Sequence, residues 1–399
     1  MKRYIALLLS ILVALWIAPQ SIAAPKAVTA GLGSIYTPPV AAENYLLLGK
    51  NVIYYNNVES ETADILVTSF DFTNTQSWQL KIDSGADEVI SSASTDPLGN
   101  IWLVGSASLL TQVETATSNA GIDNPDGITE DPSPALRNDL NQLALWKVSQ
   151  KGELLATYLL PQKSVPLATG ISVKNSGISI TGILENKPFF ITATVGGLFG
   201  KVLFLGSAKT EINSLARSED GTTALYGSSS ETLAGKKLMG KRDGILMKVS
   251  KSGSITSLVR SSANGASRGW TSADSVNLLS GYVLTGAKSE IAITKFTSTF
   301  APSWTSRYAG IGAPISISGG GYSYLAFTSK SAIAGVNGWK PSEAGLIVLT
   351  FNGKGLLQAA TSLPGLVTPL NLAYSRDRGV LGMASSADGS VSIFTLVSR

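Results

Sequence analysis

Carboxylate side chains are the first candidates for chemistry in this sequence, because it contains no histidine and no cysteine in 399 residues. A Ser-His-Asp or Cys-His nucleophile therefore cannot form, and an imidazole or thiolate metal site is excluded as well. Two kinds of chemistry remain open. Paired carboxylates could cleave a glycoside, and oxygen ligands could hold calcium.

Three acidic residues are candidates for catalysis because they fall near the ends of short polar runs that we expect to line a central axis: Glu88, Glu211 and Asp274. None has a matched partner in the pattern. A sialidase-like site would also need several arginines near the axis, and only Arg217 and Arg376 qualify. An enzyme is therefore the weaker hypothesis.

A second acidic set recurs at the start of one strand type, at Asp64, Asp243 and Glu290. Equivalent positions of a repeat are spread around a structure and do not converge on one point. A carboxylate at a loop-strand junction also commonly accepts backbone hydrogen bonds. The set therefore predicts a structural role.

Loops of unusual length are the candidate binding surfaces. The longest, about residues 109–141, carries an acidic cluster that includes Asp123, Asp126, Glu130 and Asp131. Its spacing matches no EF-hand, so a solvated loop is favoured over a calcium site, and no cofactor is expected. A basic loop contains Lys236, Lys237, Lys241 and Arg242. A third loop carries Trp339, which could stack on a sugar or protein surface or fold back onto the body.

A repeated glycine-bounded strand positions these loops. Four copies are clear, one is degenerate and two are looser, with alanine in place of the closing glycine; they lie at residues 99–105, 177–182, 221–227, 281–286, 49–56, 321–326 and 379–384. A second alternating strand follows each copy, then a turn and another strand. Together with one preceding apolar run, each unit has four strands and recurs about every 50 residues.

Four antiparallel strands at this period describe a β-propeller blade, so we predict an all-β propeller of seven four-stranded blades. The first, third and sixth units depart from the pattern at one or more glycines, which leaves a count of six to eight open. An extended run at about 28–36 would supply the outermost strand of the last blade and remove both open edges of the ring.

The units, best seen in DGILMKVSKSG (243–253) and DPLGNIWLVGS (96–106), resemble the tandem repeats of secreted bacterial β-propeller proteins. The similarity covers nearly the whole chain after its first segment. It rests on structural residues, so it implies a fold and transfers no catalytic signature.

The first 23 residues predict a secretory signal peptide, because Lys2 and Arg3 precede a short apolar run that ends at Pro19. Residues 24–399 would then form a single propeller domain without a membrane span. The formal net charge is +4, and Lys2 and Arg3 supply two of these charges. No basic stripe with interleaved aromatic residues supports nucleic-acid binding.

The sequence thus predicts a secreted, monomeric, disulfide-free binding or scaffolding module. Its expected partner is an extracellular or cell-surface protein or polysaccharide, recognised by the long loops on one rim. The alternative is a glycan-active enzyme that uses axial carboxylates, with or without calcium.

Overall fold

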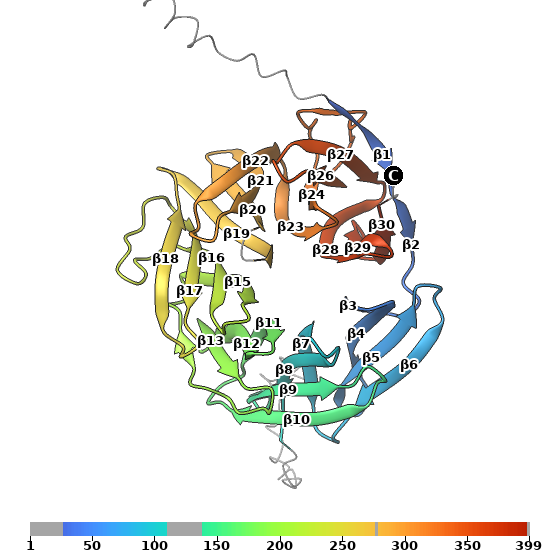
Figure 1. Ribbon diagram of the computed structural model, residues 1–399, viewed down its shortest axis with the longest axis vertical. Coiled ribbons are helices and arrows are strands. Elements are labelled where there is room, and N and C mark those ends of the chain that lie inside the picture. The colour runs from blue at the N-terminus through green and yellow to red at the C-terminus, as the bar shows by residue number, and fades with distance from the viewer. Residues whose placement is uncertain (1–26, 110–137, 276–277, 397–399) are drawn as a thin grey trace, which may run out of the picture.

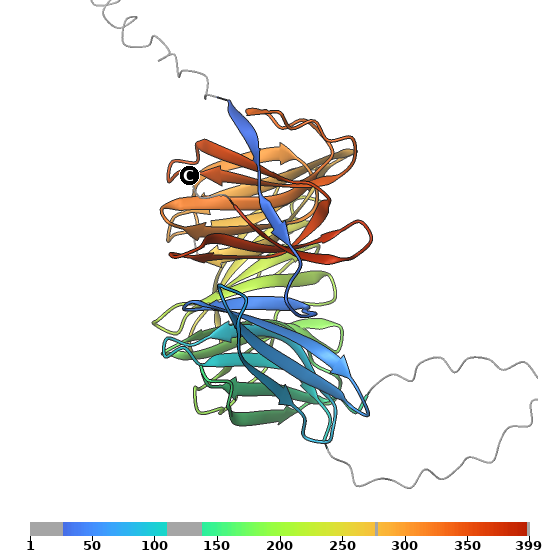
Figure 2. The same ribbon diagram turned by 90° about the vertical axis from the view of Figure 1, so that its right-hand side faces the viewer.

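A computed structural model describes residues 27–109, 138–275 and 278–396 of the chain. Their strands form seven sheets, six of four strands and one of six. The sheets follow one another in chain order around a central axis (Figure 1) and form a flat disc when seen from the side (Figure 2). The predicted all-β propeller is therefore confirmed.

The sheets are numbered in chain order, each from its innermost strand outward. Sheet 1 has β3 (Asn44–Leu48), β4 (Asn51–Glu59), β5 (Ala63–Asp71) and β6 (Gln76–Ile82); sheet 2 has β7 (Glu88–Thr95), β8 (Ile101–Ala107), β9 (Gln142–Val148) and β10 (Leu154–Pro161). Sheet 3 has β11 (Leu167–Lys174), β12 (Gly177–Leu184), β13 (Lys187–Ala193) and β14 (Leu203–Phe204); sheet 4 has β15 (Thr210–Arg217), β16 (Thr223–Ser229), β17 (Asp243–Val249) and β18 (Ile255–Ser261).

The remaining sheets continue the same order. Sheet 5 has β19 (Ala266–Ser275), β20 (Leu278–Thr285), β21 (Lys288–Phe296) and β22 (Pro302–Ala309); sheet 6 has β23 (Ile311–Gly319), β24 (Tyr322–Ser329), β26 (Gly345–Phe351), β27 (Leu357–Leu363), β1 (Val28–Leu32) and β25 (Val336–Asn337). Sheet 7 has β28 (Leu366–Ser375), β29 (Gly379–Ser386), β30 (Val391–Thr395) and β2 (Ser34–Tyr36). The innermost strands contact one another in a closed cycle, since β28 contacts β3 and β3 contacts β7.

Ring closure differs from the prediction, in which a single strand over residues 28–36 completes the last blade. Only β2 does so, by antiparallel pairing with β30. β1 instead pairs in parallel with β27 of sheet 6, so that sheet has six strands and the predicted uniform set of seven four-stranded blades is wrong there. Gly33 lies at the crossing, where a Cβ atom would be 2.6 Å from the Leu363 side chain.

The hydrophobic core lies between neighbouring sheets. Trp102 and Val104 of sheet 2, for example, pack in one cluster with Ile178 and Ile180 of sheet 3. A second strand such as β8 is buried along its whole length because both of its faces meet adjacent sheets, whereas the outermost β10 is partly exposed throughout. Disulfide-free stability therefore rests on apolar packing between sheets.

The closing glycine of the repeated element is required by a bulge in the innermost strand. Opposite Gly227 the register of β15 shifts by one residue, and a Cβ atom on Gly227 would lie 1.8 Å from the Glu211 carbonyl oxygen. Gly105 and Gly281 face equivalent bulges. In sheet 1 the β3–β4 pairing has no register shift, and Asn56 occupies the glycine position.

Within the described ranges, no helix is long and apolar enough to cross a membrane. The proposed signal peptide and most of the 109–141 insertion lie outside these ranges.

Candidate functional site: an arginine-lined pocket between sheets 4 and 5

A pocket of about 230 Å³ lies between the outer strands of sheet 4 and the facing side of sheet 5. Its charged lining comes from three strands, with Arg260 on β18, Arg268 on β19 and Arg307 on β22. Its apolar lining includes Trp270, Phe296 and Phe300. Arg260 and Arg307 lie near the C-terminal ends of their strands, whereas Phe296 is the last residue of β21 and Phe300 lies in the turn between β21 and β22. The pocket thus has a cationic end and an aromatic end.

Arg260 and Arg307 belong to a repeated ion-pair position. In three sheets a cation on the outermost strand faces the recurring acid of the third strand; the pairs are Lys81 Nζ–Asp64 Oδ2 at 2.9 Å, Arg260 Nη1–Asp243 Oδ2 at 3.2 Å and Arg307 Nη1–Glu290 Oε2 at 3.9 Å. Asp64 and Asp243 also accept hydrogen bonds from the preceding loop. The structural role predicted for these acids is confirmed for Asp64 and Asp243.

Arg268 has a different environment. Its Nη1 donates a 3.4 Å hydrogen bond to Ser261 Oγ, and no carboxylate of the described residues lies within ion-pair distance of it. Burial lowers the pKa of Arg268 and the neighbouring Arg307 lowers it further, against a smaller opposing effect of Asp243. The guanidinium is thus a desolvated cation beside another cation, and a bound anion would relieve both effects.

Three donor atoms of the pocket lining are buried without a hydrogen-bond partner among the described residues: Arg260 Nε, Arg268 Nε and Trp270 Nε1. Native proteins leave few buried donors unpaired, because each costs about 1–3 kcal/mol. Three in the lining of one pocket indicate a place where a ligand supplies the acceptors.

The aromatic end contains a residue in a strained backbone conformation. Phe300 has φ 62°, in the left-handed region, and its N–H donates to the Thr297 carbonyl to close the β21–β22 turn. The equivalent position of the other turns between a third and a fourth strand holds glycine or asparagine, at Asn74, Gly152, Gly197, Gly253 and Gly355. A phenylalanine there is an outlier of the kind that recurs at functional sites.

The Phe300 ring replaces a packing arrangement found at other interfaces. The rings of Trp78, Tyr158 and Trp304, each on an outer strand, lie against the turn glycine of the next sheet. β18 of sheet 4 has no aromatic residue. Phe300 instead reaches back from sheet 5, is 6% exposed, and lies 4.6 Å from Lys248 Nζ. From this position Phe300 lines the pocket.

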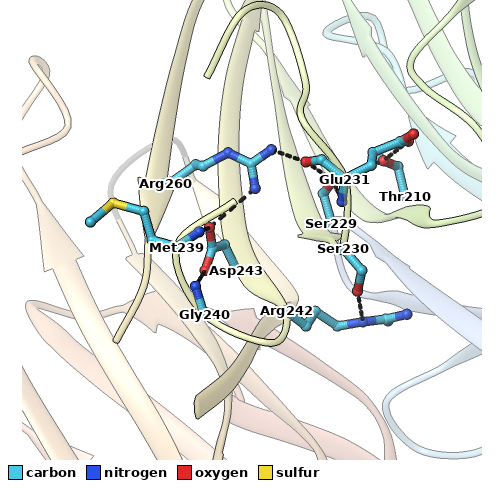
Figure 3. A network of polar contacts seen from close by, with 9 residues as sticks. All are labelled: Thr210, Ser229, Ser230, Glu231, Met239, Gly240, Arg242, Asp243 and Arg260. Carbon is cyan, nitrogen blue, oxygen red and sulfur yellow. Dashed lines mark hydrogen bonds and ion pairs between the residues drawn. The ribbon is translucent and has the colours of Figure 1, made fainter. Parts of the chain in front are cut away.

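The basic loop between β16 and β17 lies at the cationic end of the pocket. Figure 3 shows how Asp243 accepts the N–H groups of Met239 and Gly240 and also pairs with Arg260. The loop continues across to sheet 5, because the N–H of Arg268 donates to the Arg242 carbonyl at 2.9 Å. Arg260 and Arg268 are thereby fixed to one short segment.

The predicted basic residues contribute to this loop in different ways. Lys236, Lys237 and Lys241 are exposed, whereas Arg242 is half-buried and pairs with Glu211 at 2.8 Å. None of the four lines the pocket. The arginines that do line it, at positions 260, 268 and 307, were not singled out by the sequence patterns.

Trp339 does not present a stacking surface. Its side chain is 6% exposed, packs in the core cluster between sheets 5 and 6 and donates from Nε1 to the Ser331 carbonyl at 3.0 Å. Of the two alternatives for Trp339, the structure shows the one in which the side chain folds back onto the body, where the indole N–H has a partner within its own loop. Asp123, Asp126, Glu130 and Asp131 lie outside the described residues, so the calcium alternative stays a prediction.

The candidate catalytic acids do not converge. Glu211, at the start of β15, is paired with Arg242, and Asp274, near the end of β19, accepts the Ser318 N–H. Glu88 lies at the start of β7 in another sheet. The described residues also contain no group of three side chains suited to hold a metal ion.

The fold and the pocket define a β-propeller with a small interblade site. No family model matches the chain, and no curated protein does. Among solved structures, the WD40 domain of Toxoplasma gondii coronin aligns with 94% of this chain and 90% of its own, with a TM-score of 0.53 and 10% identity. An oligogalacturonate lyase in complex with manganese covers 94% and 99%, with a TM-score of 0.53 and 12% identity. These similarities show the propeller fold alone.

Proposed function

We propose that this propeller is a binding module for a small organic anion, held in the pocket between sheets 4 and 5. The observation that carries the proposal is the set of three unpartnered donors in its lining, on Arg260, Arg268 and Trp270. A carboxylate, sulfate or phosphate would accept from the guanidinium groups in the bidentate manner that arginine favours.

The aromatic end of the pocket determines the shape and polarity of the part of the ligand that carries no charge. Trp270 and Phe296 pack edge to face with ring centroids 5.6 Å apart, and Phe300 completes the same cluster. A volume of about 230 Å³ is below the roughly 300–1,000 Å³ of typical small-molecule sites. A compact anion with a flat apolar body fits both ends.

Export through residues 1–23 remains part of the proposal. A secreted propeller would then meet its anion outside the cell, either free or as part of a cell-surface protein or polysaccharide. The long loops of the rim would carry any larger contact.

A pair of matched compounds tests the proposal. Phenylacetate and its neutral counterpart phenylacetamide would be titrated into the purified chain by calorimetry, within a panel of aryl carboxylates. We expect saturable binding of the acids, at least tenfold weaker binding of the amides, and weaker acid binding as salt increases.

Arg268→Met is the matched variant, because it keeps an unbranched apolar stem and removes the charged guanidinium group. We expect at least a tenfold loss of acid affinity with unchanged far-UV circular dichroism. Arg376→Met, an exposed arginine outside the pocket, serves as the control. Absence of acid binding throughout the panel, or binding that Arg268→Met leaves intact, would overturn the proposal.

A further inference from the structure

A second pocket, also of about 230 Å³, lies between sheets 1 and 2. Its polar lining includes Lys81, Asp83 and Glu88, and its apolar lining includes Trp146 and Leu159. The residues that line it come from β6 and the segment after it in sheet 1, and from all four strands and one loop residue of sheet 2. It shares no lining residue with the arginine-lined pocket.

Glu88 has one carboxylate oxygen in this pocket that lacks a hydrogen-bond partner among the described residues. The residue is 3% exposed, and its Oε1 accepts a hydrogen bond from Ser84 Oγ. Its Oε2 is buried and has no hydrogen-bond partner among the described residues. A buried carboxylate oxygen without a donor is costly, so the site is incomplete as it stands.

The charges near Glu88 determine which kind of ligand would pair with its free oxygen. Lys81 Nζ is already held between Asp64 Oδ2 and Asp83 Oδ2, at 2.9 Å from each. One cation therefore faces two carboxylates before Glu88 is counted, and the surroundings favour a further positive charge. In agreement, the pKa of Glu88 is raised: burial raises it most, hydrogen bonding by Ser84 opposes the shift, and the nearby Asp64 and Asp83 add to it.

An organic ammonium suits the pocket better than a metal ion. A divalent cation needs several free oxygen ligands, whereas Asp64 and Asp83 are committed to Lys81. The described residues contain no group of three potential metal ligands. A primary ammonium needs only a few acceptors, and the Trp146 and Leu159 side chains offer apolar contact to the carbon skeleton of the ligand.

We infer that this pocket binds a primary ammonium group attached to a compact apolar body, with Glu88 Oε2 as its principal acceptor. This site is independent of the proposed anion site, because the two are separated by whole sheets and bind opposite charges. Each can therefore fail without the other.

The experiment titrates 2-phenylethylamine, within a series of aryl and alkyl primary amines, into the whole chain by calorimetry, with the matched alcohols as neutral analogues. We expect saturable amine binding and at least tenfold weaker alcohol binding. Glu88→Gln should weaken amine binding at least tenfold and leave phenylacetate binding unchanged. Conversely, Arg268→Met should leave amine binding unchanged.

Two further variants separate a loss of binding from a loss of folding. Glu219→Gln removes an exposed carboxylate on sheet 4 and should have no effect on amine affinity. Leu159→Trp fills the pocket from a strand residue that is 40% exposed, so it should fold and abolish amine binding. The inference is overturned if no amine in the series binds, if the alcohols bind as tightly as the amines, or if either Glu88→Gln or Leu159→Trp binds amine like the wild type.

Discussion

Glu88 and Arg268 occupy equivalent positions in sheets 2 and 5. Each lies two residues before the innermost-strand residue that pairs with the closing glycine, Ile90 with Gly105 and Trp270 with Gly281. Each lines a pocket against the preceding sheet and has one buried, unpartnered polar atom. The same repeat position thus carries opposite charges at two interfaces, which supports one site for an anion and another for a cation.

The raised pKa of Glu88 predicts how stability changes with pH. Below about 4.5 the carboxyl is protonated in both states; above it the unfolded chain loses the proton while the folded chain keeps it until its own higher pKa is passed. The wild type should therefore lose stability relative to Glu88→Gln as pH rises through this window. Urea unfolding between about pH 4 and pH 7 measures the difference. A difference that stays constant with pH would contradict this.

The bulge opposite Gly227 predicts that its replacement by alanine is costly. The added Cβ would lie 1.8 Å from the Glu211 carbonyl oxygen, so the innermost strand of sheet 4 would have to move. We expect a loss of at least about 2 kcal/mol in the free energy of unfolding. Gly353→Ala, in open space and without a positive φ, should stay within about 0.5 kcal/mol. Equal effects of the two variants in urea unfolding would rule out the steric account.

The Arg217 side chain links sheets 3 and 4, and its replacement should therefore destabilise the fold. Its guanidinium donates to Ser179 Oγ at 2.9 Å, and to Ser176 Oγ at 3.1 Å and the Ser176 carbonyl at 2.7 Å. Arg217→Met should destabilise the fold by about 2–3 kcal/mol, because it removes three charge-assisted hydrogen bonds of a buried guanidinium. The exposed Arg376→Met should have little effect on the thermal midpoint. An unchanged midpoint for Arg217→Met would show that the link is dispensable.

Much of the fold could be predicted because the repeated residues are ones that the backbone conformation requires. Glycines such as Gly105 and Gly227 recur where a bulge brings a carbonyl oxygen against the strand, so their spacing reports the strand order directly. The parallel pairing of β1 could not be predicted. Residues 28–36 form one extended run in the sequence, and only the crossing at Gly33 divides it between two sheets.

The candidate site was less predictable because its residues are contributed by different strands. Arg307 is an exposed residue between half-buried neighbours on an outermost strand, and Arg260 is half-buried on another, so in the sequence both look like ordinary surface residues. Loop length and charge instead pointed to Lys236 and Trp339, neither of which lines the pocket. One signal was available, since the turn TSTFA (297–301) has phenylalanine where SKSGS (250–254) has glycine.

Phe300 gives the most direct test of strain at the site. At a left-handed position glycine is favoured over alanine by about 1–2 kcal/mol, whereas within a strand alanine is favoured by about 0.5–1 kcal/mol. We therefore expect Phe300→Gly to be more stable than Phe300→Ala, and the order to reverse at Phe296, which has the same ring, lies in the same cluster and is in a strand. Urea unfolding of the four variants measures both differences. Both Phe300 variants should also weaken phenylacetate binding, because the ring forms the apolar wall. The same order at both positions would mean that Phe300 is held without strain.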